Sequence, residues 1–349
     1  MQKAEYMARI KLPQAVALEL TYKCNHKCLF CSCPWYAPKS SYPLGKELDV
    51  EQWKNAIDIL FENGVRSFSI SGGECTLKEG LSQIVEYIRS ESDKRKIKHP
   101  IVLISNGSAM SDEYLKLFKR CNVHLSMSLP GYETFEQHTG VDNVDGVLKW
   151  FKKAKALGIT TTLNVTVTAK NIHELFETIS LGLINGASSV LLNRFLPGGR
   201  GLSNMKELML TNKQLNEMLS VAEEVLLLSN RYGFVGTEIP FCAVDNPNRY
   251  KKINIGYKCA AVKGFFVVDP SGNIRTCNHS PRIVGNIFAK PMIEDVEYWK
   301  IFADSQYKPD YCKDCKALKS CDASCREVAN ILKGSPCEID PTLAINRQT

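Results

Sequence analysis

The stretch that decides the fold is Cys24-Asn25-His26-Lys27-Cys28-Leu29-Phe30-Cys31, which follows the apolar run 15–21. That run predicts a strand, so the three cysteines stand on the loop at its carboxyl end. Three thiolates on one tight loop can bind three irons of a four-iron cluster and leave the fourth iron open. A structural zinc site would need a fourth protein ligand, for which Cys33 and His26 are the nearby candidates, but the strand-then-loop placement argues against zinc.

Outward from this loop, short β-rich runs alternate with amphipathic helices as far as residue 195. We predict strands over 15–21, 67–71, 101–105, 123–129, 160–166 and 189–194, and helices over 50–63, 80–90, 112–120, 144–157 and 172–183. Six parallel strands with helices between them predict an α/β fold, a partial TIM-like (β/α)6 barrel. In such barrels the active site lies at the carboxyl ends of the strands.

Composition changes along the chain and suggests three regions. The turn-rich stretch 197–201 ends the regular pattern, so we expect the barrel to occupy residues 1–200. A bridging region over 201–254 follows, with a helix predicted over 213–229. From residue 255 the chain is rich in loops and carries seven of its 14 cysteines. A segment so poor in long apolar runs needs internal staples, so we expect a small α+β domain over 255–349 that clusters hold together.

Charge and cysteine content limit the class of protein. The net charge is +7. The basic run 94–98 lies between a helix and a strand and is interpreted as a solvated loop, so we expect no nucleic-acid partner. No apolar run reaches the roughly 20 residues of a membrane span, and residues 1–13 have no signal-peptide core. We therefore expect a cytoplasmic protein without a membrane partner, whose clustered thiols bind metal rather than form disulfides.

The second predicted strand ends in Ser71-Gly72-Gly73-Glu74. Two glycines let backbone carbonyls approach a ligand closely, and a carboxylate can receive an ammonium group. Together with the cysteine triplet, this motif resembles the signature of the radical S-adenosylmethionine superfamily. The resemblance implies that Cys24, Cys28 and Cys31 hold a [4Fe–4S] cluster whose open iron binds S-adenosylmethionine. One electron from the cluster would then cleave that cofactor to a 5′-deoxyadenosyl radical.

The same resemblance suggests which residues contact the cofactor. Phe30 would lie against the adenine, and Gly72, Gly73 and Glu74 would bind the methionyl amine. At the later strand ends, relatives carry ribose, carboxylate and adenine contacts, and the matching residues here are Ser105, Asn106, Ser126, Asn164 and Arg194. For each of these a plain hydrogen-bonded barrel residue is an equally good interpretation, although Ser126 and Arg194 fit a ribose or carboxylate best.

The C-terminal cysteines follow a second pattern. Cys259 precedes Gly272-x4-Cys277, then come Cys312-x2-Cys315-x5-Cys321-x3-Cys325 and finally Cys337, which matches the seven-cysteine SPASM pattern. Zinc-ribbon spacing accounts for part of this set but not for all seven. A hairpin predicted over 265–274 presents Cys277 at its end.

The SPASM resemblance implies two auxiliary [4Fe–4S] clusters, and so three clusters in all. The outer cluster would be held by Cys312, Cys315, Cys321 and Cys337, and the inner one by Cys259, Cys277 and Cys325. Cys242 is the nearby candidate for a fourth inner ligand, but a catalytic thiol and a merely buried cysteine remain open interpretations. Cys75 and Cys121 are predicted to be free structural thiols.

The resemblance spans residues 15 to about 340 and implies a maturase that abstracts hydrogen from a ribosomally made peptide and installs a carbon–carbon or thioether crosslink. Alternatives are a formylglycine-type sulfatase maturase, a peptide epimerase and a non-catalytic iron–sulfur electron carrier. We expect a peptide or protein substrate and a flavodoxin or ferredoxin reductant. Because the cysteine loop begins at residue 24, we expect no N-terminal leader-binding domain, so that either a separate protein would recognise a leader or the substrate would be bound directly.

Overall fold

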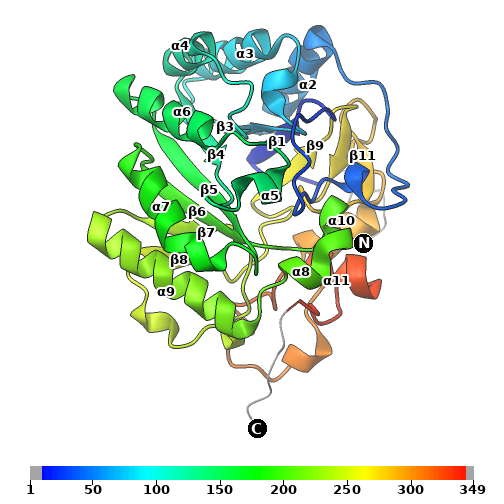
Figure 1. Ribbon diagram of the computed structural model, residues 1–349. Coiled ribbons are helices and arrows are strands. Elements are labelled where there is room, and N and C mark those ends of the chain that lie inside the picture. Colours follow the sequence, from blue (N-terminus) through cyan, green and yellow to red (C-terminus); the bar gives the residue numbers. More distant parts are fainter. Residues whose placement is uncertain (1–9, 343–349) are drawn as a thin grey trace.

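The computed structural model describes residues 10–342, whose strands form one sheet in the order β11-β10-β9-β1-β2-β3-β4-β5-β6-β7-β8 (Figure 1). The strands are β1 Ala15–Glu19, β2 Ser67–Ser71, β3 Ile101–Ser105, β4 Val123–Ser128, β5 Thr161–Val167, β6 Ser189–Arg194, β7 Gly233–Val235, β8 Ile253–Ile255, β9 Phe265–Val268, β10 Asn273–Arg275 and β11 Ile283–Asn286. The six predicted strands are β1 to β6, all parallel to their neighbours. The predicted α/β partial barrel is therefore confirmed.

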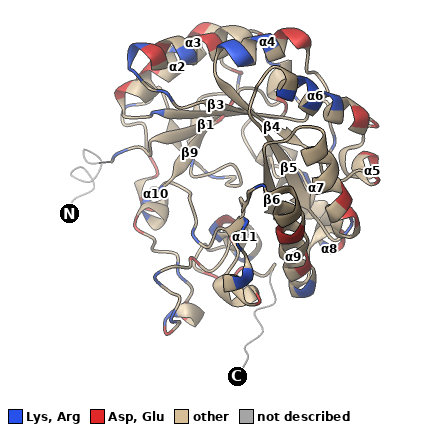
Figure 2. Cartoon of the chain, turned by 90° about the vertical axis from the view of Figure 1, so that its left-hand side faces the viewer, with Lys and Arg blue, Asp and Glu red and all other residues tan. Residues whose placement is uncertain are grey.

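Helices that connect the parallel strands cover the outer face of this sheet (Figure 1). In chain order the helices of the structure are α2 Val50–Glu62, α3 Leu81–Lys94, α4 Asp112–Arg120, α5 Phe135–Thr139, α6 Val144–Ala156, α7 Leu175–Ile184, α8 Met205–Leu208, α9 Asn212–Ser229, α10 Val296–Ala303 and α11 Arg326–Lys333. Charged residues are concentrated on the helices and loops, whereas the strands carry few (Figure 2). Trp53, Phe118 and Phe151, from α2, α4 and α6, are fully buried in the core between helices and sheet. Burial of such aromatic side chains is a main source of stability.

The sheet extends past the last predicted strand into the region expected to be a bridge. β7 pairs in parallel with β6, and β8 with β7. Each has only three residues, too few for a clear alternating pattern, so the sequence interpretation missed both. The predicted helix over 213–229 is present as α9, and it begins at a capping box of Thr211 and Gln214.

At the other edge, the C-terminal segment joins the first strand. The predicted hairpin is confirmed as β9 and β10, and β9 pairs in parallel with β1. The guanidinium of Arg275 on β10 forms an ion pair with Glu19 on β1, and their side chains are 0% and 4% exposed. Tyr42 donates to the carboxylate of Asp269 at 2.6 Å, which fixes the turn before β10. The hairpin is therefore locked onto the strand that carries the cysteine loop.

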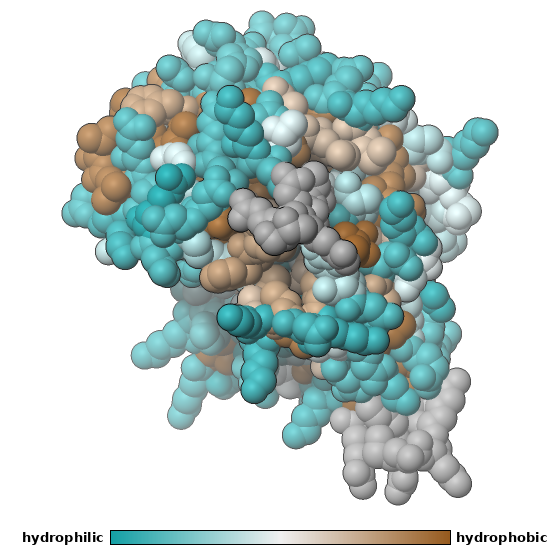
Figure 3. All heavy atoms as spheres, turned by 90° about the horizontal axis from the view of Figure 1, so that it is seen from below, coloured by the Kyte–Doolittle hydropathy of each residue, from teal (hydrophilic) through white to brown (hydrophobic). Residues whose placement is uncertain are grey.

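The surface offers little sign of a membrane segment. Within residues 10–342, no helix is both long and apolar enough to cross a bilayer. Seen from below, polar side chains cover most of the molecule and hydrophobic ones gather in small groups (Figure 3).

Candidate active site

One cavity of about 450 Å³ lies where the parallel strands end. Its walls come from the loops after β1, β2 and β3, from the ends of β4, β5 and β6, and from the C-terminal segment. The sequence-predicted residues that line it are Cys24, Cys28, Phe30, Cys31, Gly72, Gly73, Glu74, Ser105, Asn106, Asn164, Arg194, Cys259, Cys277 and Cys325. Two cysteine groups that are far apart in the sequence thus face the same space.

The cysteine loop after β1 is clamped on one side by α5. The backbone N–H groups of Lys27 and Leu29 donate to the carbonyls of Thr139 and His138, each at 2.9 Å. These bonds fix the loop's backbone between its first and last cysteine. Rigid backbone support of this kind holds ligand side chains ready for a metal group.

The short 3-10 helix Gly199–Asn204 clamps the other side of the loop. A Cβ on Gly199 would lie 2.4 Å from the carbonyl oxygen of Cys33, so only glycine allows this approach. Arg200 donates to the carbonyl of Cys28 at 3.2 Å, and Asn204 to that of Leu29 at 3.0 Å. The glycine-rich stretch that ends the regular barrel pattern therefore also shapes the cysteine loop.

Burial and the nearby Arg200 act in opposite directions on the three thiols of the loop. Burial raises the pKa of Cys24 and Cys28, while the side-chain hydrogen bond to Cys33 lowers the pKa of Cys31 to about 7. Arg200 favours the charged form of all three. Within residues 10–342, no three His, Cys, Asp or Glu side chains converge as ligands of a single metal ion would.

Glu74 is a buried carboxylate, 2% exposed, at the edge of the cavity. Its Oε1 accepts from the Thr76 N–H at 3.0 Å, the Thr76 hydroxyl at 2.6 Å and Ser105 Oγ at 2.8 Å. Its Oε2 accepts from the Asn106 N–H at 2.7 Å. Among residues 10–342 it has no ion pair, although a buried anion is normally paired with a positive charge. A ligand ammonium group would supply that charge. Ser105 and the Asn106 backbone orient Glu74, a role that the sequence interpretation did not give them.

The two glycines before Glu74 are required by close backbone packing. Gly72 has a φ of +146°, and a Cβ there would lie 2.8 Å from the Thr21 carbonyl oxygen. A Cβ on Gly73 would lie 2.2 Å from the Lys23 carbonyl oxygen. The N–H groups of Gly73 and Glu74 donate to the same two carbonyls, at 2.7 and 2.8 Å. The Gly-Gly-Glu turn is thus bound to the start of the cysteine loop, which fixes both binding elements relative to each other.

Of the other predicted cofactor contacts, Phe30 and Asn164 line the cavity, whereas Ser126 does not. Phe30 lies in the cavity wall, with its ring 6.1 Å from that of His138. Asn164 also lines the cavity and accepts from Asn193 at 2.9 Å. Ser126 does not line it: its hydroxyl is buried and unpartnered, and Ser128, two residues farther along β4, lines the cavity instead. We therefore move the predicted cofactor contact from Ser126 to Ser128.

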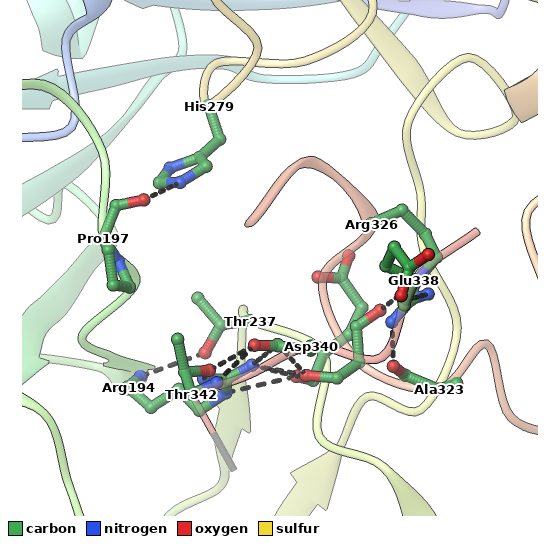
Figure 4. Close-up of polar contacts among 11 residues, drawn as sticks. Arg194, Pro197, Thr237, His279, Ala323, Arg326, Glu338, Asp340 and Thr342 are labelled. Atoms are coloured by element: carbon green, nitrogen blue, oxygen red, sulfur yellow. Dashed lines mark hydrogen bonds and ion pairs between the residues drawn. The ribbon is translucent and has the colours of Figure 1, made fainter. Parts of the chain in front are cut away.

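Arg194 has a different role from the one predicted. Its guanidinium forms an ion pair with Asp340 at 2.9 Å and donates to Thr342 at 2.9 Å, to Ser324 and to the carbonyl of Glu238 (Figure 4). Although Arg194 borders the cavity, these partners occupy its head group, so we withdraw its assignment to the cofactor. The residue ties the C-terminal tail to the end of β6.

The inner cysteine set meets the cavity from the C-terminal side. Cys277 follows β10, Cys325 is the N-cap of α11, and burial raises the pKa of both and of Cys259. Asp322 accepts from the Cys259 N–H at 2.9 Å and from Tyr307 at 2.8 Å, which fixes the loop that bears Cys259. The three thiols therefore share the cavity with the first cysteine triplet.

Sequence reasoning missed several ionisable residues in the same wall, among them Glu238 and His279. Glu238 lines the cavity, and burial raises its pKa. His279 Nε2 donates to the Pro197 carbonyl at 2.7 Å, because a carbonyl oxygen can only accept, so Nε2 carries the proton; burial lowers the pKa of His279 to about 4. No motif marks Glu238, whereas His279 lies two residues after Cys277 and that position was the available signal.

The outer cysteines lie outside the cavity. Cys312, Cys315, Cys321 and Cys337 are half-buried or exposed, and none lines it. Cys242 is also exposed and outside the cavity, and the N–H of its neighbour Phe241 donates to Cys321 Sγ at 3.4 Å. The segment that carries Cys242 therefore lies beside Cys321, outside the cavity, and the role of Cys242 as an inner ligand or a catalytic thiol stays a prediction.

Comparisons with known proteins agree with this geometry. Residues 18–182 match the family model of the Radical SAM superfamily. A PqqA peptide cyclase of Bradyrhizobium diazoefficiens is 26% identical over 351 residues, covering 96% of this chain and 87% of the cyclase. An AdoMet-dependent heme synthase of Methanosarcina barkeri is 25% identical over 356 residues, covering 96% of this chain and 97% of the heme synthase.

Among solved structures, Streptococcus suis SuiB bound to S-adenosylmethionine superposes with a TM-score of 0.73. The identity is 16%, and the match covers 97% of this chain and 79% of SuiB. At that identity the likeness establishes a shared fold.

Proposed function

Because the chain belongs to the radical S-adenosylmethionine superfamily, we propose that it modifies a ribosomally made peptide by forming a crosslink within it. One observation carries the proposal: the first cysteine triplet, the Gly-Gly-Glu turn and the inner cysteine set all line one cavity. A peptide side chain in that cavity would lie between a radical source and an electron acceptor. The 26% identity to a PqqA peptide cyclase over 96% of the chain supports a peptide as the substrate.

The residues that would hold the cofactors follow from the site. Cys24, Cys28 and Cys31 would bind the radical-generating [4Fe–4S] cluster, and Glu74 would receive the ammonium group of S-adenosylmethionine. When bound, the pair supplies a carbon radical that takes a hydrogen atom from the substrate. Cys259, Cys277 and Cys325 would hold an inner auxiliary cluster.

This chain's own residues would orient the reactants and exclude water. Ser105, Thr76 and the Asn106 N–H hold Glu74 in one orientation, so little reorganisation is needed when the cofactor binds. His279, neutral at pH 7 because burial lowers its pKa to about 4, holds the Pro197 carbonyl and so fixes the loop after β6. Proposed partners remain a flavodoxin or ferredoxin reductant and a separate leader-binding protein.

A second candidate is a reaction of heme synthesis that depends on S-adenosylmethionine. The heme synthase of M. barkeri is 25% identical and matches over 97% of its own length, which favours this reaction. The epimerase alternative is weaker, because Cys242, the thiol considered for it, lies outside the cavity. A pure electron carrier would have no use for a buried, unpaired carboxylate such as Glu74.

The test is an anaerobic assay of reconstituted protein with S-adenosylmethionine and a strong reductant. 5′-Deoxyadenosine should form in the wild type and not in a variant that lacks the first three cysteines. Candidate precursor peptides encoded near the gene are then added, and a crosslink lowers the peptide's mass by a pair of hydrogen atoms. Formation of heme from an added heme precursor, with every peptide unchanged, would instead establish heme synthesis.

A further inference from the structure

The loop that carries Cys277 is folded around the guanidinium group of Arg275. Nη1 of Arg275 donates to the carbonyl of Ser280 at 2.8 Å and to that of Asn278 at 3.1 Å. A longer contact of 3.5 Å joins the same nitrogen to the carbonyl of Cys277. The pairing of β10 with β11 is irregular between Ile274 and Arg275, and such an irregularity re-aims a side chain. The position of Cys277 therefore depends on where this one guanidinium group lies.

The second terminal nitrogen of Arg275 is bound to the strand that leads to the first cysteine loop. This nitrogen, Nη2, forms an ion pair with Oε2 of Glu19, the last residue of β1. Oε1 of Glu19 accepts from the side-chain amide of Asn278 at 3.3 Å. Glu19 and Asn278 both line the cavity. The ion pair thus connects the segment before Cys24 with the segment that carries Cys277, across 256 residues of the chain.

Two aromatic rings from the segment after the cysteine loop also lie next to this guanidinium group. The ring centroids of Trp35 and Tyr42 lie 5.9 and 5.6 Å from its central carbon. Contacts of this kind attract a cation to the face of a ring. Trp35 belongs to the short 3-10 helix Pro34–Tyr36, which directly follows Cys33. The guanidinium group is therefore bound on both sides of the cysteine loop in the sequence, by Glu19 before it and by Trp35 after it.

Stability alone is a poor explanation for this arrangement. The side chains of Arg275 and Glu19 are 0% and 4% exposed, so folding removes both charges from water. The cost of that desolvation offsets most of their attraction, and two apolar side chains would often stabilise such a buried site as well or better. A guanidinium group, however, donates its N–H bonds in one plane and in fixed directions. The ion pair is therefore suited to fixing the geometry of the two segments that it joins.

We propose that Arg275 and Glu19 are positioning residues that set the distance between the first cysteine triplet and the inner cysteine set. The inference rests on the proposed function for the presence of a cluster at each set. A substrate in the cavity lies between the two sets, so their separation decides how well it meets both. The first triplet has its own clamps at α5 and at residues 199–204. Loosening Arg275 should therefore lower the yield of modified peptide per molecule of S-adenosylmethionine cleaved.

The first experiment measures amide hydrogen exchange in protein without clusters, so its result depends on neither clusters nor substrate. Arg275→Lys keeps a positive charge opposite Glu19 but lacks the planar fork that binds several carbonyls at once. We expect amides of residues 277–282 to exchange about tenfold faster, the effect of losing one hydrogen bond from a charged group. The matched control is Arg66→Lys, because Arg66 donates to the carbonyls of Phe61 and Val65 outside the cavity. It should leave residues 277–282 unchanged, and unchanged exchange in the Arg275 variant would overturn the proposal.

The second experiment measures the distance between reduced clusters in loaded protein by pulsed electron paramagnetic resonance. The inner set shares the cavity with the first triplet, so its cluster gives the shorter of the distances from the first cluster. We expect a narrow distance distribution in the wild type and a broader or shifted one in Arg275→Lys. The ratio of modified peptide to 5′-deoxyadenosine should fall about tenfold or more, because small misplacements of reacting groups are costly. The double variant Arg275→Met with Glu19→Leu removes both charges at once and should broaden the distribution in the same way.

The distance measurement also separates this inference from the proposed function. If the first cluster of the wild type shows no second cluster nearby, the inner cluster is refuted, and the positioning role with it. If both clusters are present and the Arg275 variants keep the wild-type distances and product ratio, the positioning role alone is refuted. A variant with normal distances but lower unfolding stability would likewise show that the ion pair serves the fold and not the site.

Discussion

Replacing Glu74 by glutamine tests the cofactor pocket most directly. The amide matches the carboxylate in shape, so Oε1 can keep its bonds from Thr76 and Ser105. The negative charge disappears, and the amide nitrogen faces the Asn106 N–H, which now donates to Oε2 at 2.7 Å. We expect S-adenosylmethionine to bind more weakly and the iron content to stay the same.

The magnitude follows from the loss of one charge-assisted hydrogen bond to the ligand's ammonium group. Such a bond contributes about 1.5–3 kcal/mol, which corresponds to a roughly 10- to 150-fold rise in Kd. The orphaned Asn106 N–H costs a further ~1–3 kcal/mol of folding stability, which a lower Tm would report.

The assay is calorimetric titration of S-adenosylmethionine into anaerobically reconstituted protein. The control is Glu223→Gln, which removes the charge of a carboxylate that accepts backbone N–H bonds from residues 251–253 and lies outside the cavity. It should lower the Tm without changing the Kd. Equal cofactor affinity in the Glu74 variant and the wild type would show that the ammonium group binds elsewhere.

Further predictions address the cluster loop and the tail. Replacing Cys24, Cys28 and Cys31 together should lower the iron content by about four atoms per chain, from roughly twelve. An unchanged iron content would refute the assignment of the first cluster site. Gly73→Ala should disrupt the loop and abolish 5′-deoxyadenosine formation, because its Cβ would lie 2.2 Å from the Lys23 carbonyl oxygen. Asp340→Leu should cost about 3–5 kcal/mol in chemical denaturation by leaving Arg194 buried and uncompensated, and adding Arg194→Met should restore most of it. Burial alone would raise the pKa of Asp340, but Arg194 holds it below its ordinary value, so the ion pair stabilises the fold fully above about pH 4 and stops doing so as pH falls through the lowered pKa. A Tm that falls with acidification as steeply in Asp340→Asn as in wild type would contradict this assignment.

The sequence predicted the barrel well because each of β1 to β6 is long enough to show its apolar pattern and is followed by an amphipathic helix. β7 and β8 gave no such signal, since three residues cannot establish a period. In the site, motif spacing located the residues whose role depends on local geometry, such as Gly73 and Glu74. Arg194 was misassigned because its partner Asp340 lies 146 residues later in the chain, a contact that no local pattern reports.

The surroundings of Cys242 also depend on contacts between residues far apart in the chain. Its separation of 17 residues from Cys259 made the inner set the natural choice from sequence. In the folded chain the backbone turns away after β7, and Phe241 meets Cys321 across 80 residues. Ser126 was misplaced by only one strand period, because Ser126 and Ser128 share a face of β4 and only Ser128 lies at the rim of the cavity.

The pairing of β9 with β1 also constrains when the protein can mature. β1 carries the first cysteine loop, yet one of its two neighbours is made of residues 265–268. A ribosome must synthesise most of the chain before that edge of β1 can be covered, and closing so long a loop is slow compared with forming local structure. Until then the loop stands beside an open strand edge, exposed to solvent and to oxidants. The strand that carries the first cysteine loop therefore gains its second neighbour only after the C-terminal segment has been made.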